Sequence, residues 1–247
     1  MHISLEAETI TSILGFPITN SLVLSVLTTL FLASVSLLLV RALSLIPNKG
    51  QGVLELGIES LLGFMAGVLG SAEQAKRFFP LVASFFLFIL FNNWLGVLPG
   101  TGSIGFTEML DGKEIFVPFF RSANSDLNTT FALAIISVIA IQAYGIWKQG
   151  FLGHLSKFFT FTKGPVYFFV GILELVAEFA KVLSFSFRLF GNIFAGEVLL
   201  LIIMTLVPVI VPLPFFMLEF FVGFIQALVF AMLTLVFLKI ATESVSH

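Results

Sequence analysis

The sequence contains no cysteine and few charged residues, and both absences exclude whole classes of function. Without cysteine there is no disulfide, no thiolate nucleophile and no thiolate metal ligand. The 12 lysines and arginines form no clustered basic face of the kind that binds nucleic acid, and the net charge is only −2. Charged residues make up 11% of the chain, against about 25% in an average soluble domain. The chain therefore has too few charges to keep its surface in water.

Apolar residues are what the chain has in abundance. Of its 247 residues, 58% are hydrophobic and 32 are phenylalanine, and the mean hydropathy is +1.11. A lipid bilayer is the solvent that suits such a composition. Hydrophobic segments follow one another from residue 22 almost to the end, so we expect a single membrane domain over residues 1–247. The first ten residues have no basic cluster, and we expect neither a cleavable signal peptide nor a transit peptide there.

Five segments are expected to be transmembrane helices, because about 20 apolar residues cross a ~30 Å hydrocarbon core. They are residues 21–45, 78–98, 127–147, 165–206 and 215–242. Residues 53–70 are less apolar, and Glu55 and Glu59, four apart, share one helix face. We expect this segment to be an amphipathic interfacial helix or a tucked-in segment. The predicted fold class is an all-α membrane protein with about five transmembrane helices and one interfacial helix.

The basic residues predict an orientation in the membrane, because lysine and arginine gather on the cytoplasmic side. With five crossings and the N-terminus outside, two basic residues lie outside, Lys113 and Arg121. Eight lie inside: Arg41, Lys49, Lys76, Arg77, Lys148, Lys157, Lys163 and Lys239. We therefore expect an external N-terminus and a cytoplasmic C-terminus.

The fourth predicted span is about twice as long as a membrane requires. As one helix, residues 165–206 would extend ~63 Å. Pro165 fits the first turn of a helix, and no proline follows before Pro208. The segment either breaks near Gly191 or Gly196 or lies steeply inclined, and we favour a long, steeply tilted hairpin with the last helix. Such a hairpin suits a partner protein that passes across it.

Ionisable residues interrupt the apolar sequence of this fourth span. At 100° per residue, five polar residues fall within a sector of roughly 80° of a helix, with Ser184 at its edge. They are Glu174, Glu178, Lys181, Arg188 and Asn192. Glu197 is nine residues after Arg188, so it lies on the opposite face and ~13 Å along the axis. In the last helix, Glu219 and Gln226 are seven residues apart and share a face.

Charged groups inside a membrane are costly, and they indicate function by default. A carboxylate takes up and releases protons, whereas an arginine keeps its positive charge at any working pH. A permanent cation between two groups of titratable residues repels hydronium and attracts a deprotonated carboxylate that moves past it. Arg188 is therefore expected to block direct proton flow and to receive a mobile carboxylate.

The segment LSFSFRLFGNIFAGE, residues 183–197, closely resembles the signature of subunit a of F-type ATP synthases, in its bacterial form. The resemblance covers nearly the whole chain. The stretch NNWLGVLPG is similar to the end of a membrane span in that family, SDLNTTFALA to the entry of the next span, and IQALVFAMLTLVFL to the terminal helix. Because subunit a is the membrane stator beside the c-ring, the resemblance implies that the tilted hairpin lies beside that ring.

The resemblance also implies roles for matching positions. Arg188 corresponds to the essential arginine of proton translocation, and Gln226 to the glutamine that faces it. Asn192 follows the arginine by one turn, as in the family. The outer half of the proton path is implied for Glu197, Glu219 and Asp126, and the inner half for Glu174, Lys181 and Ser184. Glu178 has no counterpart that carries over, but its position places it with the inner group. Glutamate at both 197 and 219 is unusual and leaves their division of roles open.

The implied function is proton conduction through two offset half-channels, coupled to rotary ATP synthesis. The implied partners are the c-ring, subunit b of the peripheral stalk, the rest of the ATP synthase and membrane lipid. No phosphate-binding glycine-rich loop is present, so we expect no catalysis by this chain alone. No cofactor or metal is expected. The implied location is the inner cell membrane, or alternatively an organelle inner membrane.

Three alternatives remain at this point. A secondary ion-coupled transporter also carries intramembrane charges, but usually in paired halves, which this sequence lacks. A purely structural subunit has no reason to keep Arg188 and several carboxylates in lipid. Within the proton path, Glu174, Glu178 and Lys181 could equally be an interfacial cluster of ion pairs. The coupling ion is proton by default, with sodium as the alternative.

Overall fold

The computed structural model describes residues 7–13, 15–42, 44, 48–98, 100–101, 104–110, 113–155, 165–207 and 210–242. Six long helices dominate these residues: α1 (Asn20–Ala42), α2 (Lys49–Leu69), α3 (Ala72–Val97), α4 (Leu127–Gln149), α6 (Pro165–Leu206) and α7 (Pro212–Thr242). All six are long and apolar enough to cross a membrane. The chain is therefore an all-α membrane protein. Three residues used above in the predictions, Lys157, Lys163 and Pro208, lie outside the described residues.

Local sequence signals explain where several helices begin and end. The Asn48 and Ser71 side chains accept hydrogen bonds from the backbone N–H groups of Gln51 and Gln74, and so cap the starts of α2 and α3. Between these helices, Gly70 has a φ of 73°, a left-handed conformation that glycine adopts without strain. A glycine cap directly followed by a serine cap makes a tight reversal, which returns the chain toward the bundle.

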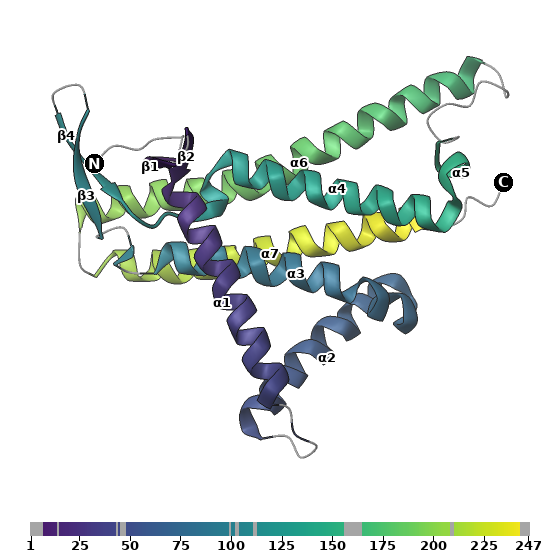
Figure 1. Ribbon diagram of the computed structural model, residues 1–247, viewed down its shortest axis with the longest axis horizontal. Helices are drawn as coiled ribbons and strands as arrows, with labels where there is room; N and C mark the ends of the chain where they lie inside the picture. Colours follow the sequence, from purple (N-terminus) through teal and green to yellow (C-terminus); the bar gives the residue numbers. More distant parts are fainter. Residues whose placement is uncertain are drawn as a thin grey trace.

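The core of the molecule is built around α3 and α7, which pack along each other with α4 and α6 beside them (Figure 1). One apolar cluster joins α3, α4 and α7 to the end of α2, and includes Met65, Val82 and Leu235. A second joins α3, α4, α6 and α7, and includes Ile89 and Ile193. The two clusters hold the long helices side by side over most of the length of α7.

The first two long helices leave this bundle. Figure 1 shows α1 running obliquely across α3, α4 and α7, and α2 returning toward the start of α3. The predicted interfacial segment is part of α2, which is longer than expected and begins at Lys49. All side chains from residue 53 to residue 60 are exposed, Glu55 and Glu59 included. Six helices rather than five are thus long enough to span, and an interfacial position for α2 stays a prediction.

The long fourth predicted span is a single helix without a break at Gly191 or Gly196. This helix, α6, contains 42 residues and pairs with α4 and α7. Its first part diverges from both of them (Figure 1). From residue 166 to residue 180, the described side chains are exposed apart from Gly171 and the half-buried Glu178. Only the second part of α6 is therefore packed into the bundle.

Short elements that the sequence reading did not anticipate occur in the connections. Two antiparallel hairpins form, β1 (Thr9–Ile13) with β2 (Phe16–Thr19), and β3 (Gly105–Leu110) with β4 (Lys113–Pro118). A short 3-10 helix, η2 (Ala123–Ser125), precedes α4, and α5 (Phe151–Leu155) follows it. A two-stranded hairpin is short and depends on packing against other elements for its stability. A sequence dominated by long hydrophobic runs therefore gives no clear signal for it.

Candidate functional site

Arg188 lies on α6 where the helix is packed into the bundle, yet its side chain is exposed. Its guanidinium Nη2 donates a hydrogen bond of 3.0 Å to the Ser184 hydroxyl, one turn earlier. Beside it is a cavity of about 10 Å³, lined also by Gln226 of α7. This is roughly the space that a single water molecule occupies. The structure thus brings together Arg188, Ser184 and Gln226, of which the sequence reading had placed Gln226 opposite Arg188 and Ser184 in the inner group.

One side of the surface around Arg188 is made of small and polar residues. Asn192 is exposed one turn further along α6, and Gly191 and Ala195 are exposed beside it. A Cβ added at Gly191 would meet no atom of this chain within 4 Å. Small residues on a membrane helix let another helix approach closely. This face of α6 therefore offers a fixed cation on a surface to which another helix can pack.

Glu197 lies on a different face of α6 and contacts the segment that leads into α4. Its Oε2 is 3.4 Å from Nε of Arg121, and that same nitrogen donates a hydrogen bond of 3.1 Å to the Ser125 hydroxyl. The two charged side chains are mostly covered, with 13% and 24% of their surfaces exposed. Arg121 thus supplies a counter-charge to Glu197. The sequence reading counted Arg121 only for orientation.

Glu219 of α7 is buried, with 5% of its surface exposed. Its carboxylate fills a notch left by Gly196 on α6, where an added Cβ would overlap the carboxylate oxygens. Its Oε1 is buried without a hydrogen-bond partner among the described residues. Gly196 and Glu197 are adjacent, so two of the three outer carboxylates predicted from the sequence, Glu197 and Glu219, lie at the same turn of α6. One has a counter-charge in Arg121, whereas the other has a buried oxygen without a partner.

An amide cluster, formed by Asn92, Asn93 and Asn124, is buried at the same end of the bundle. The Asn93 amide nitrogen donates to the Gly223 carbonyl at 3.0 Å, and its oxygen accepts from the Asn124 amide at 2.7 Å. The Trp94 indole N–H donates to the Phe220 carbonyl at 3.0 Å. The hydrogen bonds of Asn93 and Trp94 to backbone carbonyls of α7 fix the position of this helix next to Glu219. The sequence signal was the run NNW within an apolar span, which we interpreted only as the end of that span.

Asp126 is buried near the amide cluster, and both of its oxygens have partners. Oδ1 accepts a hydrogen bond from the Asn128 backbone N–H at 3.0 Å, which caps the start of α4. Oδ2 accepts one from the Ser21 hydroxyl of α1 at 2.9 Å. The structure therefore gives Asp126 a positioning function that joins α1 to α4. A further part in proton transfer stays a prediction.

The inner group of predicted residues lies on the part of α6 that leaves the bundle. Glu174 is exposed. Glu178 and Lys181 form an ion pair with a distance of 2.6 Å, and Lys181 also lies 4.7 Å from the centre of the Phe237 ring. Oε2 of Glu178 is buried without a hydrogen-bond partner in the described part of the chain. The geometry thus joins Glu178 to Lys181, whereas Glu174 stands apart from them.

Together, the fold and these residues define a class: a multi-pass helical membrane protein that presents charged groups within its membrane helices. Comparison with known proteins gives the family. Residues 22–239 match the family described as ATP synthase A chain. The ATP synthase subunit a of Campylobacter jejuni strain 81-176 is 34% identical over 211 residues, which cover 84% of this chain and 83% of the relative. The chain belongs to the ATP synthase A chain family.

Relatives from other bacteria are also ATP synthase a subunits. The subunit of Helicobacter pylori strain Shi470 is 34% identical over 216 residues, or 86% of this chain and 85% of the relative. That of Moorella thermoacetica is 33% identical over 198 residues, or 80% and 79%. The resemblance expected from residues 183–197 is confirmed. The chain is a membrane-sector subunit of an ATP synthase complex, and a secondary transporter is not favoured.

Proposed function

We propose that this chain is the proton-conducting stator subunit of its ATP synthase, with two offset half-channels and Arg188 between them. One observation carries the proposal: Arg188 is an exposed, permanently charged group between two acidic groups at different heights on α6. Glu197 is nine residues further along and Glu178 ten residues back, which is ~13 Å and ~15 Å along the helix axis. Neither group has a direct contact with Arg188.

In the proposed cycle, a proton enters near Asp126 and passes Glu197 and Glu219. It then neutralises a carboxylate of the c-ring, which lowers the cost of moving that carboxylate into lipid. After rotation of the ring, the proton leaves near Glu174, Glu178 and Lys181. The deprotonated carboxylate returns past Arg188. Each charge that crosses releases about 2.3 kcal/mol per 100 mV, which drives the rotation.

The contact with Arg188 has to be temporary, because a tight, fully buried pair would stop the ring. Two features of the site support a temporary contact. The guanidinium is exposed and already shares a hydrogen bond with Ser184, and the adjacent cavity has room for water. Gln226 lines that cavity from α7 and competes for the guanidinium. Each returning carboxylate therefore exchanges with the groups that already contact the Arg188 guanidinium.

The two outer carboxylates have different parts in this proposal. Arg121 compensates the charge of Glu197, which suits a fixed anion that attracts protons to the outer entrance. Glu219 has a buried oxygen without a partner among the described residues, which suits the group that binds and releases the proton. The geometry thus separates two carboxylates that the sequence treats alike.

The proposed assembly has the c-ring against the Arg188 face of α6, and subunit b of the peripheral stalk and lipid on other surfaces. The exposed Gly191 and Ala195 support the ring contact. We propose the inner cell membrane as the location, with an external N-terminus and a cytoplasmic C-terminus. Figure 1 shows α1 crossing the other helices at a steep angle. When α1 stands upright in the membrane, the α6–α7 hairpin is therefore strongly tilted. The chain on its own performs no ATP chemistry.

The test is ATP-driven proton pumping in inverted membrane vesicles that contain Arg188→Ala. Pumping is expected to fall to background while the complex remains assembled, and a passive proton leak is expected to increase. Arg41→Ala, which removes an exposed arginine near the end of α1, is the matched control and is expected to pump normally. Normal pumping by the Arg188→Ala complex would refute the proposed role.

A further inference from the structure

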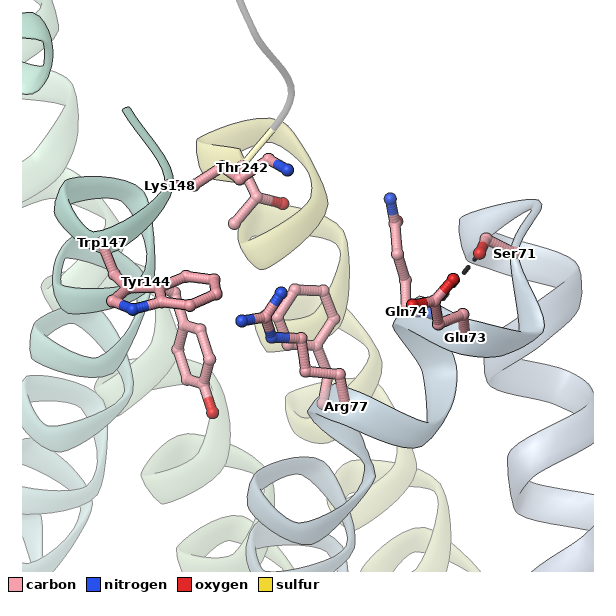
Figure 2. Close-up of a pocket in the computed structure, with 9 residues that line it drawn as sticks. Ser71, Glu73, Gln74, Arg77, Tyr144, Trp147, Lys148 and Thr242 are labelled. Carbon is pink, nitrogen blue, oxygen red and sulfur yellow. Dashed lines mark hydrogen bonds between the residues drawn. The ribbon is translucent and has the colours of Figure 1, made fainter. Parts of the chain in front are cut away.

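A pocket lies at the end of the bundle away from Glu197 and Glu219, among the start of α3 and the ends of α4 and α7 (Figure 2). Its volume is about 400 Å³. The residues that line it are Ser71, Glu73, Gln74, Arg77, Phe78, Tyr144, Trp147, Lys148 and Thr242. The proposed proton path uses none of them. The pocket is therefore a separate feature that the proton function leaves unexplained.

The lining of the pocket is positively charged and rich in hydrogen-bond donors. Arg77 comes from α3 and Lys148 from the last turn of α4, whereas Glu73 is the single carboxylate. Within the described residues, none of these three groups takes part in an ion pair. The Gln74 amide adds a neutral donor. Two cations that form no ion pair within the described residues, with a neutral amide donor beside them, form the kind of lining that holds an anion such as a phosphate group.

Aromatic side chains hold one of the two cations in place. The Arg77 guanidinium lies 3.7 Å from the centre of the Trp147 ring, and Figure 2 shows it directed toward that ring. Such stacking orients the guanidinium and leaves its N–H groups free to bind an anion. Tyr144 is fixed in turn by an edge-to-face contact with Phe78, with 5.3 Å between ring centres. The cationic side of the pocket is therefore built rather than formed by mobile surface chains.

The position of the pocket indicates the source of the anion. The start of α3 and the ends of α4 and α7 are ends of helices that are long enough to span a membrane. Such ends lie at the level of the lipid headgroups, where tryptophan and tyrosine are enriched. Trp147 is 63% exposed and offers its ring to an amphipathic ligand. Basic pockets between membrane helices on the cytoplasmic side bind anionic headgroups.

We propose that this pocket binds the phosphate of an anionic phospholipid from the cytoplasmic leaflet. Arg77 binds two phosphate oxygens through its planar fork, and Lys148 supplies a second positive charge from the facing helix. The bound lipid joins the start of α3 to the ends of α4 and α7. The inference uses the membrane orientation given under the proposed function, but it is independent of the role of Arg188.

The experiment uses the delipidated, detergent-purified ATP synthase complex, incubated in mixed micelles with phosphatidylglycerol or with zwitterionic phosphatidylcholine. Bound lipid is quantified by mass spectrometry. Phosphatidylglycerol is expected to be retained and phosphatidylcholine not. The Arg77→Gln, Lys148→Gln double variant is expected to bind about thirtyfold more weakly, since each basic residue near an anionic lipid contributes a factor of about five. Each single variant is expected to lose about fivefold.

Lys76→Gln is the matched control, because Lys76 is exposed and directly precedes Arg77 but does not line the pocket. It is expected to bind phosphatidylglycerol as the unmodified complex does. Lys148→Arg keeps the charge and is expected to keep most of the binding, whereas Arg77→Lys keeps the charge but loses the planar fork and is expected to bind with intermediate strength. Both guard against a double variant that does not assemble. Equal retention by the double variant and the unmodified complex overturns the proposal.

Two further measurements, a competition with inorganic phosphate and a cross-linking experiment, identify the source of the anion. Inorganic phosphate at millimolar concentration is expected neither to bind nor to displace the lipid, and displacement would indicate a site for free phosphate instead. A cross-link from Lys148 to an acidic segment of another subunit, in the lipid-bound complex, would indicate a protein contact and overturn the lipid assignment. Proton pumping is measured in the same preparations, so that a failure here is distinguishable from a failure of the proton role.

Discussion

The two acidic groups of α6 look alike in the sequence but have opposite surroundings in the structure. Glu197, with Glu219 of α7, is enclosed by this chain: Arg121 pairs with one carboxylate, and the Gly196 notch receives the other. Glu174 lies on the diverging part of α6, where most side chains are exposed. One turn further along, Glu178 is mostly covered, and its ion pair within the described residues is with Lys181 of the same helix.

This difference indicates which half of the proposed path the subunit completes by itself. The outer carboxylates already have a protein environment that sets their charge and position. Glu174 lacks one, because its side chain is exposed on the diverging part of α6 (Figure 1), whereas Glu178 is mostly covered, with 17% of its side chain exposed. We infer that a neighbouring subunit or lipid completes the inner half. Variants of the two acidic groups should therefore lower proton flux to different extents and for different reasons.

The largest effect is expected from the double variant Glu197→Gln, Glu219→Gln. It removes both titratable groups from an enclosed site where no water-exposed group can replace them. The rate of potential-driven proton flux in vesicles is expected to fall about hundredfold, a typical loss for a positioned proton-transfer group. Assembly, measured by native gel electrophoresis, is expected to be normal.

The inner counterpart, Glu174→Gln with Glu178→Gln, is expected to lower the flux much less. Glu174 is exposed, so water can take over its part of the transfer. Equal losses in the two double variants would contradict the comparison, and unchanged flux in the outer variant would remove Glu197 and Glu219 from the path.

The next largest effect is expected for Gly196→Ala. The added methyl group would overlap the Glu219 carboxylate, and overpacking of this kind costs about 1–3 kcal/mol. Both the thermal denaturation midpoint of the complex and its proton flux should fall. Gly67→Ala is the control, because Gly67 lies within α2 and a Cβ there meets no atom within 4 Å.

Gly191→Ala tests whether the proposed c-ring, rather than another part of this chain, packs closely against Gly191. Within the chain there is room for the methyl group. Loss of activity without loss of stability in this variant would locate the ring contact at Gly191, whereas full activity would argue against a close helix contact there.

An effect on stability of similar size is expected from Arg121→Gln. The Arg121–Glu197 pair joins two elements 76 residues apart and is mostly covered. Leaving one charge of such a pair without its partner costs about 1–3 kcal/mol. Lys181→Gln breaks an ion pair within one helix, which is worth only about 0.2–0.5 kcal/mol.

Thermal denaturation of the two variant complexes compares these pairs directly. The Arg121→Gln complex is expected to denature at the lower temperature. The reverse order would mean that the diverging part of α6 is more firmly held than its exposure indicates.

The smallest effect is expected at Asp126, whose oxygens already have partners. Asp126→Ala removes the cap of α4 and should cost about 1 kcal/mol. Asp126→Asn keeps an oxygen for the cap and should retain most of the stability and of the proton flux. A loss of flux in Asp126→Asn as large as that in the outer double variant would instead place this carboxylate in the path.

Much of the fold could be predicted from the sequence, because hydropathy depends on local composition. Apolar runs located the membrane helices, and the absence of proline between Pro165 and Pro208 favoured an unbroken α6, as found. The β hairpins were missed, since short strands in polar connections have no strong periodicity. The length of α2 was underestimated, because its first turns are polar and capped by Asn48.

The sequence by itself determined the class of protein, and it predicted Arg188 as the central residue of the site. An arginine within an apolar helix is so costly that its presence alone indicates function, and the surrounding motif indicates the family. The tertiary structure alone decided how the other polar groups pair. Arg121 and Glu197 are 76 residues apart, and Gly196 meets Glu219 only because α6 and α7 pack in one register. Such pairings depend on long-range packing, which no local pattern of residues encodes.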